Sequence, residues 1–289
     1  RRDGTLWLDE MTRRNLELVE PMLPGTRNAT LLEALDRTLT PMGARLLRQS
    51  ILAPLCDVAA IEARLDAVEV GESGLVGDRS HALRDPDTGV VLTARRDPAL
   101  LYGRGLLTGS GVAVAAVVDV PGHGPTTDDA VISAWVGRPV TLLGPTGESQ
   151  TYENLSDPEV DDSDPVAWQG PTWSYHDSVR TQVSIVAVGD LRSWDVRRFR
   201  PNLVVSGDTA DGLVGHRIRV GGAELDVVKR IDRCVMVTRA QPGGIERDLD
   251  VLRTLRRERD LTLAVGALGG GPGPLRIGDP VEDLGPSPA

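Results

Sequence analysis

The sequence predicts an α+β protein, in which a short helical N-terminal segment is followed by a longer β-rich unit. Up to residue 69, apolar side chains recur at the three- and four-residue spacing of amphipathic helices. From Val70 onward this spacing ends, and Gly, Asp, Thr and Val become the dominant residues. The β-branched runs there are short and separated by turn residues, which is typical of strands in a sheet. The 289 residues suffice for two hydrophobic cores.

The helical segment is expected to hold three helices. Asp9 is a suitable N-cap for the first, because its carboxylate can accept a hydrogen bond from the first turn. A second helix begins within residues 30–36 and, after an interruption at Pro41, continues over residues 44–52. The third is predicted over residues 59–69, where apolar residues align on one side.

Local patterns in the β-rich unit predict strands and two helices. Strands are predicted for four β-branched runs: residues 90–93, 111–115, 140–143 and 183–188. Residues 130–136 form a short predicted helix, and the spacing of Leu249, Leu252 and Leu255 predicts another.

Three stretches are predicted to be irregular. Residues 144–171 are polar and acidic and are expected to form a solvated loop. Residues 269–271 are three glycines between apolar runs and are expected to form a hairpin turn. Residues 284–289 are expected to be a disordered tail rich in Pro and Gly.

Cys234 carries the strongest chemical signal in the chain. Valines on both sides of it predict a strand, and Lys229, Arg230 and Arg233 precede it in sequence. Cations near a thiol favour the thiolate, which attacks electrophiles and binds soft metals. On the residues alone, a buried structural cysteine is the alternative interpretation.

The composition argues against several classes of function. The 42 acidic and 32 basic residues give a formal net charge of −10, which disfavours a broad nucleic-acid-binding surface. Lys229 is the only lysine, so no residue elsewhere could form a pyridoxal-phosphate Schiff base. No phosphate-binding Gly-x-x-x-x-Gly-Lys-Ser/Thr motif occurs, so no ATP site is expected. The four histidines are scattered, which disfavours a zinc site.

Cysteine usage and hydropathy bear on the compartment and on further cofactors. Cys56 and Cys234 are the only cysteines and give no disulfide framework, which favours a reducing, cytoplasmic location. No apolar run is long enough to span a bilayer, so no membrane partner is expected. Neither a haem nor an iron–sulfur cluster is expected, since a cluster requires more cysteines than the chain has.

Several motifs together resemble the MOSC family of molybdenum-cofactor domains, which are related to the sulfurase C-terminus and to amidoxime-reducing components. The resemblance is carried by Arg233-Cys234 with the Pro-Gly turn after it and by segments that keep the family's order: residues 74–79, 85–89, 92–96, 197–205 and 278–281. It implies a strongly bent sheet or barrel with few helices. We divide this unit into an N-terminal β-rich part, residues 70–145, and a core with Cys234, residues 146–283.

The MOSC resemblance implies a molybdenum cofactor (molybdopterin) and roles for particular residues. Cys234 would be both the catalytic residue and the metal ligand, because a thiolate is a soft donor. The residues implied to contact the cofactor are Arg79, His176, Asp177, Ser178, Arg200, Asn202 and Arg233. For Arg79 the alternative is a simple ion pair with Asp78, and for His176 and Asp177 it is a role as turn residues.

Residues 1–69 resemble the start of the core helical domain of the MutS mismatch-repair family. The resemblance is carried by five segments: residues 8–18, 30–32, 35–47, 54–55 and 61–69. The family's mismatch-reading Phe-x-Glu is absent, since Phe199 is the only Phe, and so is its ATPase motif. The chain also lacks the Pro-Val-Lys-Ser strand with which MOSC proteins of this type usually begin. The two resemblances meet within residues 66–72, so we interpret the chain as a chimera.

These resemblances together imply a molybdenum-dependent oxidoreductase that reduces small N-hydroxylated substrates of the amidoxime or hydroxylamine type. Electrons are expected from an external redox protein, because no cysteine follows Cys234 to hold an iron–sulfur cluster. A non-catalytic carrier of the cofactor or of sulfur is the alternative. A DNA mismatch-repair module built on the MutS-like segment is the third hypothesis, and the missing motifs argue against it.

Overall fold

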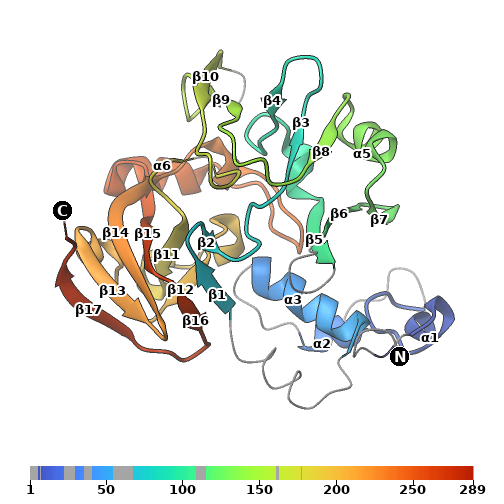
Figure 1. Cartoon of the computed structure of the whole chain (residues 1–289), viewed down its shortest axis with the longest axis horizontal. Helices are drawn as coiled ribbons and strands as arrows, with labels where there is room; N and C mark the ends of the chain where they lie inside the picture. Colours follow the sequence, from blue (N-terminus) through green and yellow to red (C-terminus); the bar gives the residue numbers. More distant parts are fainter. Residues whose placement is uncertain are drawn as a thin grey trace.

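The computed structural model describes residues 6, 8–22, 30–35, 41–54, 68–108, 115–160, 163–176 and 178–288. Within these ranges the chain forms four β-sheets and five α-helices (Figure 1). The predicted fold class is confirmed: a small helical N-terminal part precedes a β-rich unit in which one sheet curls into a half-barrel. Among these residues, no helix is both long and apolar enough to cross a membrane.

The half-barrel is a six-stranded sheet from the C-terminal half of the chain. Its strands lie in the order β12 (Leu203–Val205), β11 (Val183–Ala187), β15 (Thr262–Gly271), β14 (Ala223–Asp232), β13 (His216–Val220) and β17 (Val281–Pro286). The pair β11 and β12 is parallel, and the other neighbours are antiparallel. All five residues of β11 are buried, because an apolar cluster lies on each face of the sheet.

One face of the half-barrel packs against α6 (Asp250–Arg259). This helix buries Val251, Leu252 and Leu255, which confirms the helix predicted from the leucine spacing. The three side chains share a cluster with Phe199 and with residues of two 3-10 helices, η2 (Val188–Leu191) and η3 (Val196–Arg198). This apolar cluster therefore fixes the chain that leads into Arg200 and Asn202.

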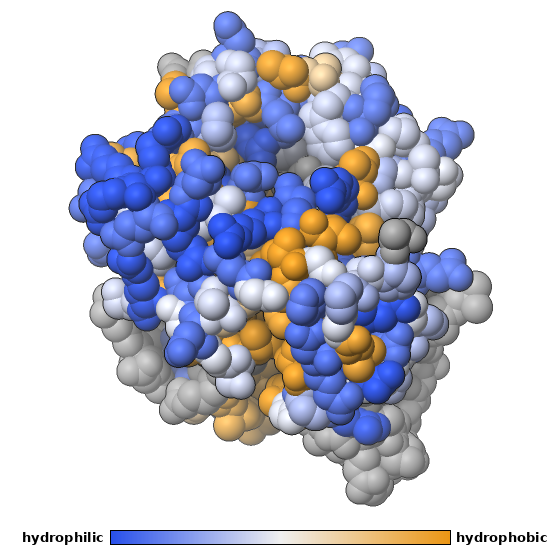
Figure 2. Space-filling view, turned by 90° about the vertical axis from the view of Figure 1, so that its left-hand side faces the viewer, coloured by the Kyte–Doolittle hydropathy of each residue, from blue (hydrophilic) through white to orange (hydrophobic). Residues whose placement is uncertain are grey.

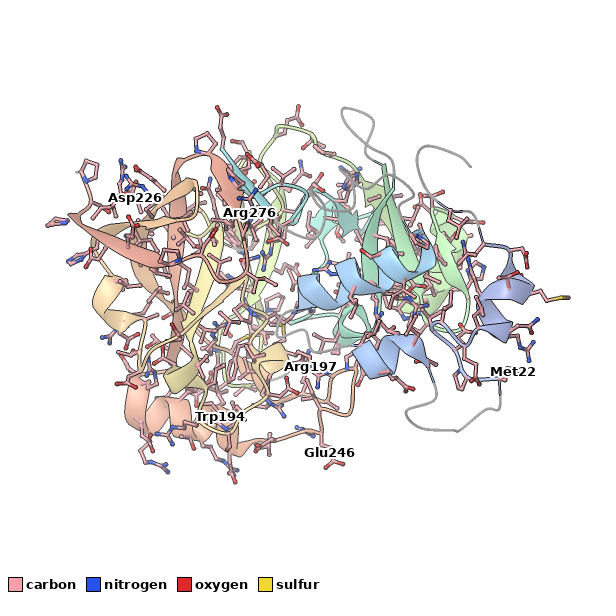
Figure 3. All side chains as sticks on the ribbon, turned by 90° about the horizontal axis from the view of Figure 1, so that it is seen from below. Met22, Trp194, Arg197, Asp226, Glu246 and Arg276 are labelled. Carbon is pink, nitrogen blue, oxygen red and sulfur yellow. The ribbon has the colours of Figure 1, made fainter. Side chains whose placement is uncertain are left out.

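Figure 2 shows the molecule from the side of the half-barrel. Hydrophilic side chains cover most of this face, and a band of apolar side chains crosses its middle. Ion pairs across the strands account for part of the polar surface: Arg217 pairs with Asp226 at 2.7 Å and Arg219 with Glu224 at 2.8 Å. Figure 3 shows Asp226 on the outer side of the half-barrel.

Two further sheets lie above and to the right of the half-barrel in Figure 1. The five-stranded sheet has the order β10 (Pro165–Gln169), β9 (Thr151–Leu155), β4 (Val90–Val91), β3 (Ala82–Arg84) and β8 (Thr141–Leu143). The three-stranded sheet joins β5 (Arg104–Thr108), β6 (Ala115–Val120) and β7 (Gly124–Thr126). The predicted short helix is present as α5 (Asp129–Val136), whose Ile132 shares a buried cluster with Val118 and Val140.

A small sheet ties the start of the β-rich unit to its end. In it, β1 (Val68–Gly71) pairs with β2 (Gly74–Leu75) and with β16 (Gly273–Leu275). Val70 and Leu75 extend into the core of the half-barrel. The helix predicted over residues 59–69 is therefore wrong at its end, because Val68 and Glu69 pair in this sheet. The remainder of that prediction lies outside the described residues.

The N-terminal helices are α1 (Glu10–Asn15), α2 (Leu31–Leu35) and α3 (Pro41–Leu52). Asp9 caps α1 as predicted, and its carboxylate accepts a hydrogen bond from the Thr12 amide at 2.8 Å. Pro41 begins α3 and does not interrupt a helix, because a proline in the first turn lacks only an N–H that the helix does not use.

Two stretches that were predicted to be irregular are strands. Residues 144–171 contain the hairpin of β9 and β10, in which the rings of Tyr152 and Trp168 stack with centroids 5.1 Å apart. The predicted tail at residues 284–289 begins inside β17, which pairs with β13. The composition of both segments is typical of loops, but backbone pairing with neighbouring strands, together with the stack of Tyr152 on Trp168, gives them regular structure.

The glycine run at residues 269–271 is also not a turn, because it lies at the end of β15. A Cβ atom at Gly270 would come within 3.1 Å of the Asp226 carboxylate, which reaches across from β14. Because Gly270 has no side chain, the ion pair of Asp226 and Arg217 fits against its backbone. Glycine is found within strands at such points of close contact.

Candidate cofactor site

Cys234 lies just beyond the end of β14, at the start of the 3-10 helix η5 (Val235–Thr238). The strand predicted around it is wrong, because the ladder between β14 and β15 ends at Asp232. The next residue, Arg233, directs its amide to the carbonyl of Leu261 at 2.7 Å, and the chain then turns. Only 7% of Cys234 is exposed, so its thiol lies in a loop that is covered by neighbouring chain.

Two buried arginines hold this loop in place. Arg233 donates from Nε to the Leu263 carbonyl at 2.9 Å and from Nη1 to the Phe199 carbonyl at 3.1 Å. Arg198 donates to the carbonyls of Val237 and Glu246, both at 2.9 Å. Charge-assisted hydrogen bonds of this kind are strong in a buried setting. The two arginines therefore join the cysteine loop firmly to the segment of residues 197–202.

This arrangement gives two arginines a structural role. Arg233 donates from Nε and Nη1 to backbone carbonyls, so it holds the loop that carries Cys234. Sequence reasoning missed Arg198, because Arg197 and Arg200 stand beside it in sequence and only the fold shows that Arg198 is the buried one that binds backbone carbonyls.

Asn202 connects two distant parts of the chain. Its side-chain oxygen accepts hydrogen bonds from the amide and the hydroxyl of Ser184, at 2.9 and 2.8 Å. Its side-chain nitrogen donates to the carboxylate of Asp78 at 2.9 Å. The amide is thus engaged at both ends, and it fixes Asp78 against the edge of the half-barrel between β11 and β12.

Asp78 is the centre of a small charged cluster. Arg79 donates to its carboxylate at 2.5 Å. Burial raises the pKa of Asp78, but Arg79, the Asn202 amide and His176 together outweigh burial, so the pKa of Asp78 lies below its ordinary value. The carboxylate is therefore ionised at neutral pH. The alternative raised for Arg79, an ion pair with Asp78, is what the structure contains.

Arg79 and Arg200, two of the predicted cofactor residues, share an uncommon backbone conformation. Arg79 has φ of 49° and Arg200 has φ of 51°, both in the left-handed region. Residues other than glycine rarely adopt this conformation, and it is enriched at functional sites, where surrounding contacts enforce it. Arg79 and Arg200 are thus two sites of local strain in segments that Asn202 joins.

The remaining predicted residues differ in what they can do. His176 is 2% exposed, and its ring lies 4.9 Å from that of Trp173. The hydroxyl of Ser178 accepts a hydrogen bond from the Arg180 amide at 3.1 Å, so it caps a local turn. Asp177 lies outside the described residues. His176 is therefore brought to the Asp78 cluster, whereas Ser178 is engaged in its own turn.

Helix α3 contributes a residue that sequence reasoning missed. Burial lowers the pKa of the Arg45 guanidinium, Asp78 raises it, and Arg79 and Arg104 lower it, which places Arg45 close to this cluster. In Figure 1, α3 runs beside β5, the strand that begins at Arg104. No sequence signal pointed to Arg45, because it lies in the MutS-like segment, which had been kept apart from the cofactor chemistry.

A cavity of about 390 Å³ opens beside Asp78. Its walls come from the hairpin of β1 and β2 with the residues that follow it, from residues 145–148 and from residues 172–175. Cys234, Arg200 and Asn202 are not among its lining residues. Two hydrogen bonds connect these parts of the structure. Arg233 links the buried loop of Cys234 to the segment that holds Phe199 and Asn202, and Asn202 links that segment to Asp78, which belongs to the charged cluster and lines the cavity.

Models of two known families match two separate parts of the chain. The model of MutS domain III matches residues 11–87, and the model of the MOSC domain matches residues 171–282. The chain thus carries segments of two families, as expected of a chimera. The second match covers His176, Arg200, Asn202, Arg233 and Cys234, whereas Asp78 and Arg79 fall within the first. MOSC domains form a family associated with binding of the molybdenum cofactor.

Curated relatives match the N-terminal part. A DNA mismatch repair protein MutS from Chlorobaculum parvum is 54% identical over 65 residues, which are 22% of this chain and 7% of that protein. A MutS from Sorangium cellulosum is 41% identical over 131 residues, 42% of this chain and 14% of that protein. The chain therefore spans only about 7 to 14% of the length of these relatives.

Proposed function

We propose that this chain binds a molybdenum cofactor through Cys234 and reduces N-hydroxylated compounds with electrons from an external redox protein. The observation that carries the proposal is the buried Cys234 loop, which Arg198 and Arg233 hold rigidly within the segment that matches the MOSC domain. A metal ligand needs such preorganisation, because a soft thiolate must be presented at a fixed position.

The residues present fit the chemistry of this group. A thiol is a suitable donor for molybdenum, and guanidinium groups bind phosphate and pterin oxygens. Arg79 and Arg200 are held in strained backbone conformations, which supports a binding role for both. Arg45 brings a further positive charge towards Asp78 and Arg79, which supports an anionic ligand nearby.

Each group of this chain then has a defined task. When bound, the cofactor would supply a redox-active metal with an open position for the substrate oxygen. Cys234 would hold the metal, and Arg79 and Arg200 would anchor the anionic part of the cofactor. Asn202 would hold Asp78, and with it Arg79, at a fixed position relative to Ser184 on β11. Arg198 and Arg233 would keep the Cys234 loop from moving during turnover.

The proposal is tested by metal content and turnover of the purified full chain. We expect molybdenum in the wild-type protein, and turnover of a hydroxylamine-type substrate with dithionite-reduced viologen but not with nicotinamide cofactor alone. Cys234→Ser should lose both the metal and the turnover while it keeps its circular dichroism spectrum. Cys56→Ser, which changes the only other cysteine, is the matched control and should keep both.

Two results would redirect the proposal. Unchanged molybdenum in Cys234→Ser would remove Cys234 as the ligand. Bound molybdenum without turnover under either reductant would favour the carrier of cofactor or sulfur, in which Cys234 holds a group for delivery.

A further inference from the structure

The thiol of Cys234 is covered by chain that lies outside the core of the half-barrel. Cys234 is buried, yet it belongs to neither of the apolar clusters on the two faces of that sheet. It is also not among the lining residues of the cavity beside Asp78. A molecule that reaches this thiol must therefore displace part of its cover.

The loop after β9 lies against the residue next to Cys234. We call residues 156–160 of this loop the strap. The Val235 amide donates to the Pro158 carbonyl at 2.8 Å. Val235 is the first residue of η5 and directly follows the cysteine. The strap thus joins the five-stranded sheet to the cysteine loop at the cysteine itself.

An ion pair with α6 holds the strap in this position. Arg256 donates to the carboxylate of Glu159, and their side chains are 62% and 26% exposed. The buried face of α6 shares an apolar cluster with Val237 of η5. Arg256 is therefore carried by the helix that supports the cysteine loop, and its ion pair fastens the strap to that support.

The strap has internal hydrogen bonds that do not depend on these two contacts. The Glu159 amide donates to the Asp157 carboxylate at 2.9 Å, and the Val160 amide donates to the Asp157 carbonyl at 3.3 Å. At its base, the Ser156 amide donates to the Asp164 carbonyl at 2.9 Å and so extends the ladder of β9 and β10. The strap can therefore lift as a unit while the hairpin stays folded.

We propose that the strap is a gate over Cys234, held shut by the ion pair of Arg256 with Glu159 and by the hydrogen bond from Val235 to Pro158. The structure contains the closed state. Loops that close over a reactive group and open to admit its ligand are common in enzymes. That the gate admits the cofactor and the substrate rests on the proposed function. A partly exposed ion pair is weak and is screened by salt, so the gate opens more often at high ionic strength.

The test follows the Val235 amide, which is released when the strap lifts. Its hydrogen exchange is measured by NMR on the full chain. The Arg233 amide is the internal reference, because it donates to the Leu261 carbonyl within the half-barrel. Glu159→Gln and Arg256→Met should each speed exchange at Val235 about threefold, as a partly exposed ion pair allows. Exchange at Arg233 should stay the same.

A matched control variant separates the gate from the overall charge of α6. Arg253→Met removes the same charge from the same helix, but Arg253 pairs with Asp250 and its side chain is 71% exposed. It should leave exchange at Val235 unchanged. Equal acceleration in Arg253→Met and Arg256→Met would overturn the proposal, as would equal acceleration at Val235 and at the reference amide.

Two further measurements test the ion pair itself. The double variant Glu159→Arg, Arg256→Glu swaps the two charges and should restore slow exchange at Val235. Raising the salt from about 0.02 M to about 0.5 M should speed this exchange in the wild type but not in Glu159→Gln. Unchanged exchange in both single variants, or no rescue by the swap, would overturn the ion pair as the fastening.

Access to the thiol is measured separately. In a Cys56→Ser background Cys234 is the only thiol, and protein expressed without molybdate keeps it free to react. Glu159→Gln should raise its rate of reaction with a disulfide reagent by the same factor as the exchange rate of Val235. Faster exchange without faster thiol reaction would show that the strap does not cover the thiol, and would overturn the gate.

The outcome is distinguishable from that of the proposed function. A strap that opens with Glu159→Gln and uncovers Cys234 would stand even if the protein held no molybdenum. Conversely, a molybdenum-loaded, active protein whose Val235 exchange and Cys234 reactivity ignore Glu159 and Arg256 would keep the reductase assignment and would overturn the gate.

Discussion

The N-terminal helices α1 and α2 and the C-terminal helix α6 differ strongly in what they bury. α6 covers the half-barrel with Val251 and Leu255 fully buried. In contrast, α1 and α2 have no buried residue among those described, and Met11 and Leu35 are 72% and 50% exposed. A periodic pattern thus specifies a helix, whereas the stabilising energy depends on the surface that the fold places opposite it.

The largest expected effect tests this contrast directly. Leu255→Ala should lower the free energy of unfolding by about 3 kcal/mol, because it leaves a cavity under α6. Leu35→Ala makes the same chemical change on α2, where the side chain is half exposed, and should cost less than about 0.5 kcal/mol. Urea denaturation of both variants measures the difference. Equal losses would mean that α2 is packed as firmly as α6.

The second comparison is between a buried and an exposed arginine in the same 3-10 helix. Arg198→Met should cost about 2 kcal/mol, because it leaves the carbonyls of Val237 and Glu246 buried without their donor. Arg197, which pairs with Asp195 and is labelled in Figure 3, is 38% exposed on its side chain. Arg197→Met should cost less than about 1 kcal/mol.

The same pair of variants gives a readout at Cys234. Freed from Arg198, the cysteine loop should open more often, so the Cys234 thiol should react faster with a thiol reagent in Arg198→Met than in Arg197→Met. Identical reaction rates in the two variants would show that Arg198 does not control the loop.

Acid should act on the five-stranded sheet through Asp85. A hydrogen bond from Arg138, with backbone amides in support, lowers the pKa of Asp85 to about 2. Because this folded pKa lies below the unfolded value of about 3.9, the stabilisation is complete above about pH 4 and is lost as the pH falls towards 2. Arg138→Met should therefore flatten the fall of Tm between pH 5 and pH 2.5. Parallel curves for the two proteins would contradict this assignment.

The smallest expected effect is at the cap of α1. Asp9→Ala removes the hydrogen bond to the Thr12 amide and should cost this helix about 1 kcal/mol. Because α1 buries nothing among its described residues, the free energy of global unfolding should change by less than about 0.5 kcal/mol. Hydrogen exchange should accelerate at Thr12 while the urea midpoint stays the same. A shifted midpoint would show that α1 is coupled to the β-rich unit.

Short sequence patterns were sufficient to predict those helices and strands whose own residues carry the helical or β-branched pattern. The leucine spacing of α6 and the β-branched run of β11 were sufficient to predict both. The hairpin of β9 and β10 was missed, because its order comes from cross-strand pairing and from the stack of Tyr152 on Trp168. Such contacts join residues whose individual propensities are weak, so a window of sequence does not contain them.

The candidate site shows the same limit. The residue types at Cys234, Arg79 and Asn202 stood out by resemblance, but their relation is set by long-range contacts. The hydrogen bond from Asn202 to Asp78 spans 124 positions of sequence. Arg198 and Arg45 were missed for a related reason: the role of each depends on a backbone or helix that only the fold brings near.

The pairing of β1 with β16 means that the boundaries of the family matches and the boundaries of the folded sheets fall at different places in this chain. β1 lies within the stretch that matches MutS domain III, yet its hydrogen-bonded partner lies within the stretch that matches the MOSC domain. A fragment cut at the MOSC match would lose Val70 and Leu75 from the core and would leave β16 as an open edge. Such a fragment should aggregate, because the stretch that matches the MOSC domain is smaller than the unit that is held together by the sheets.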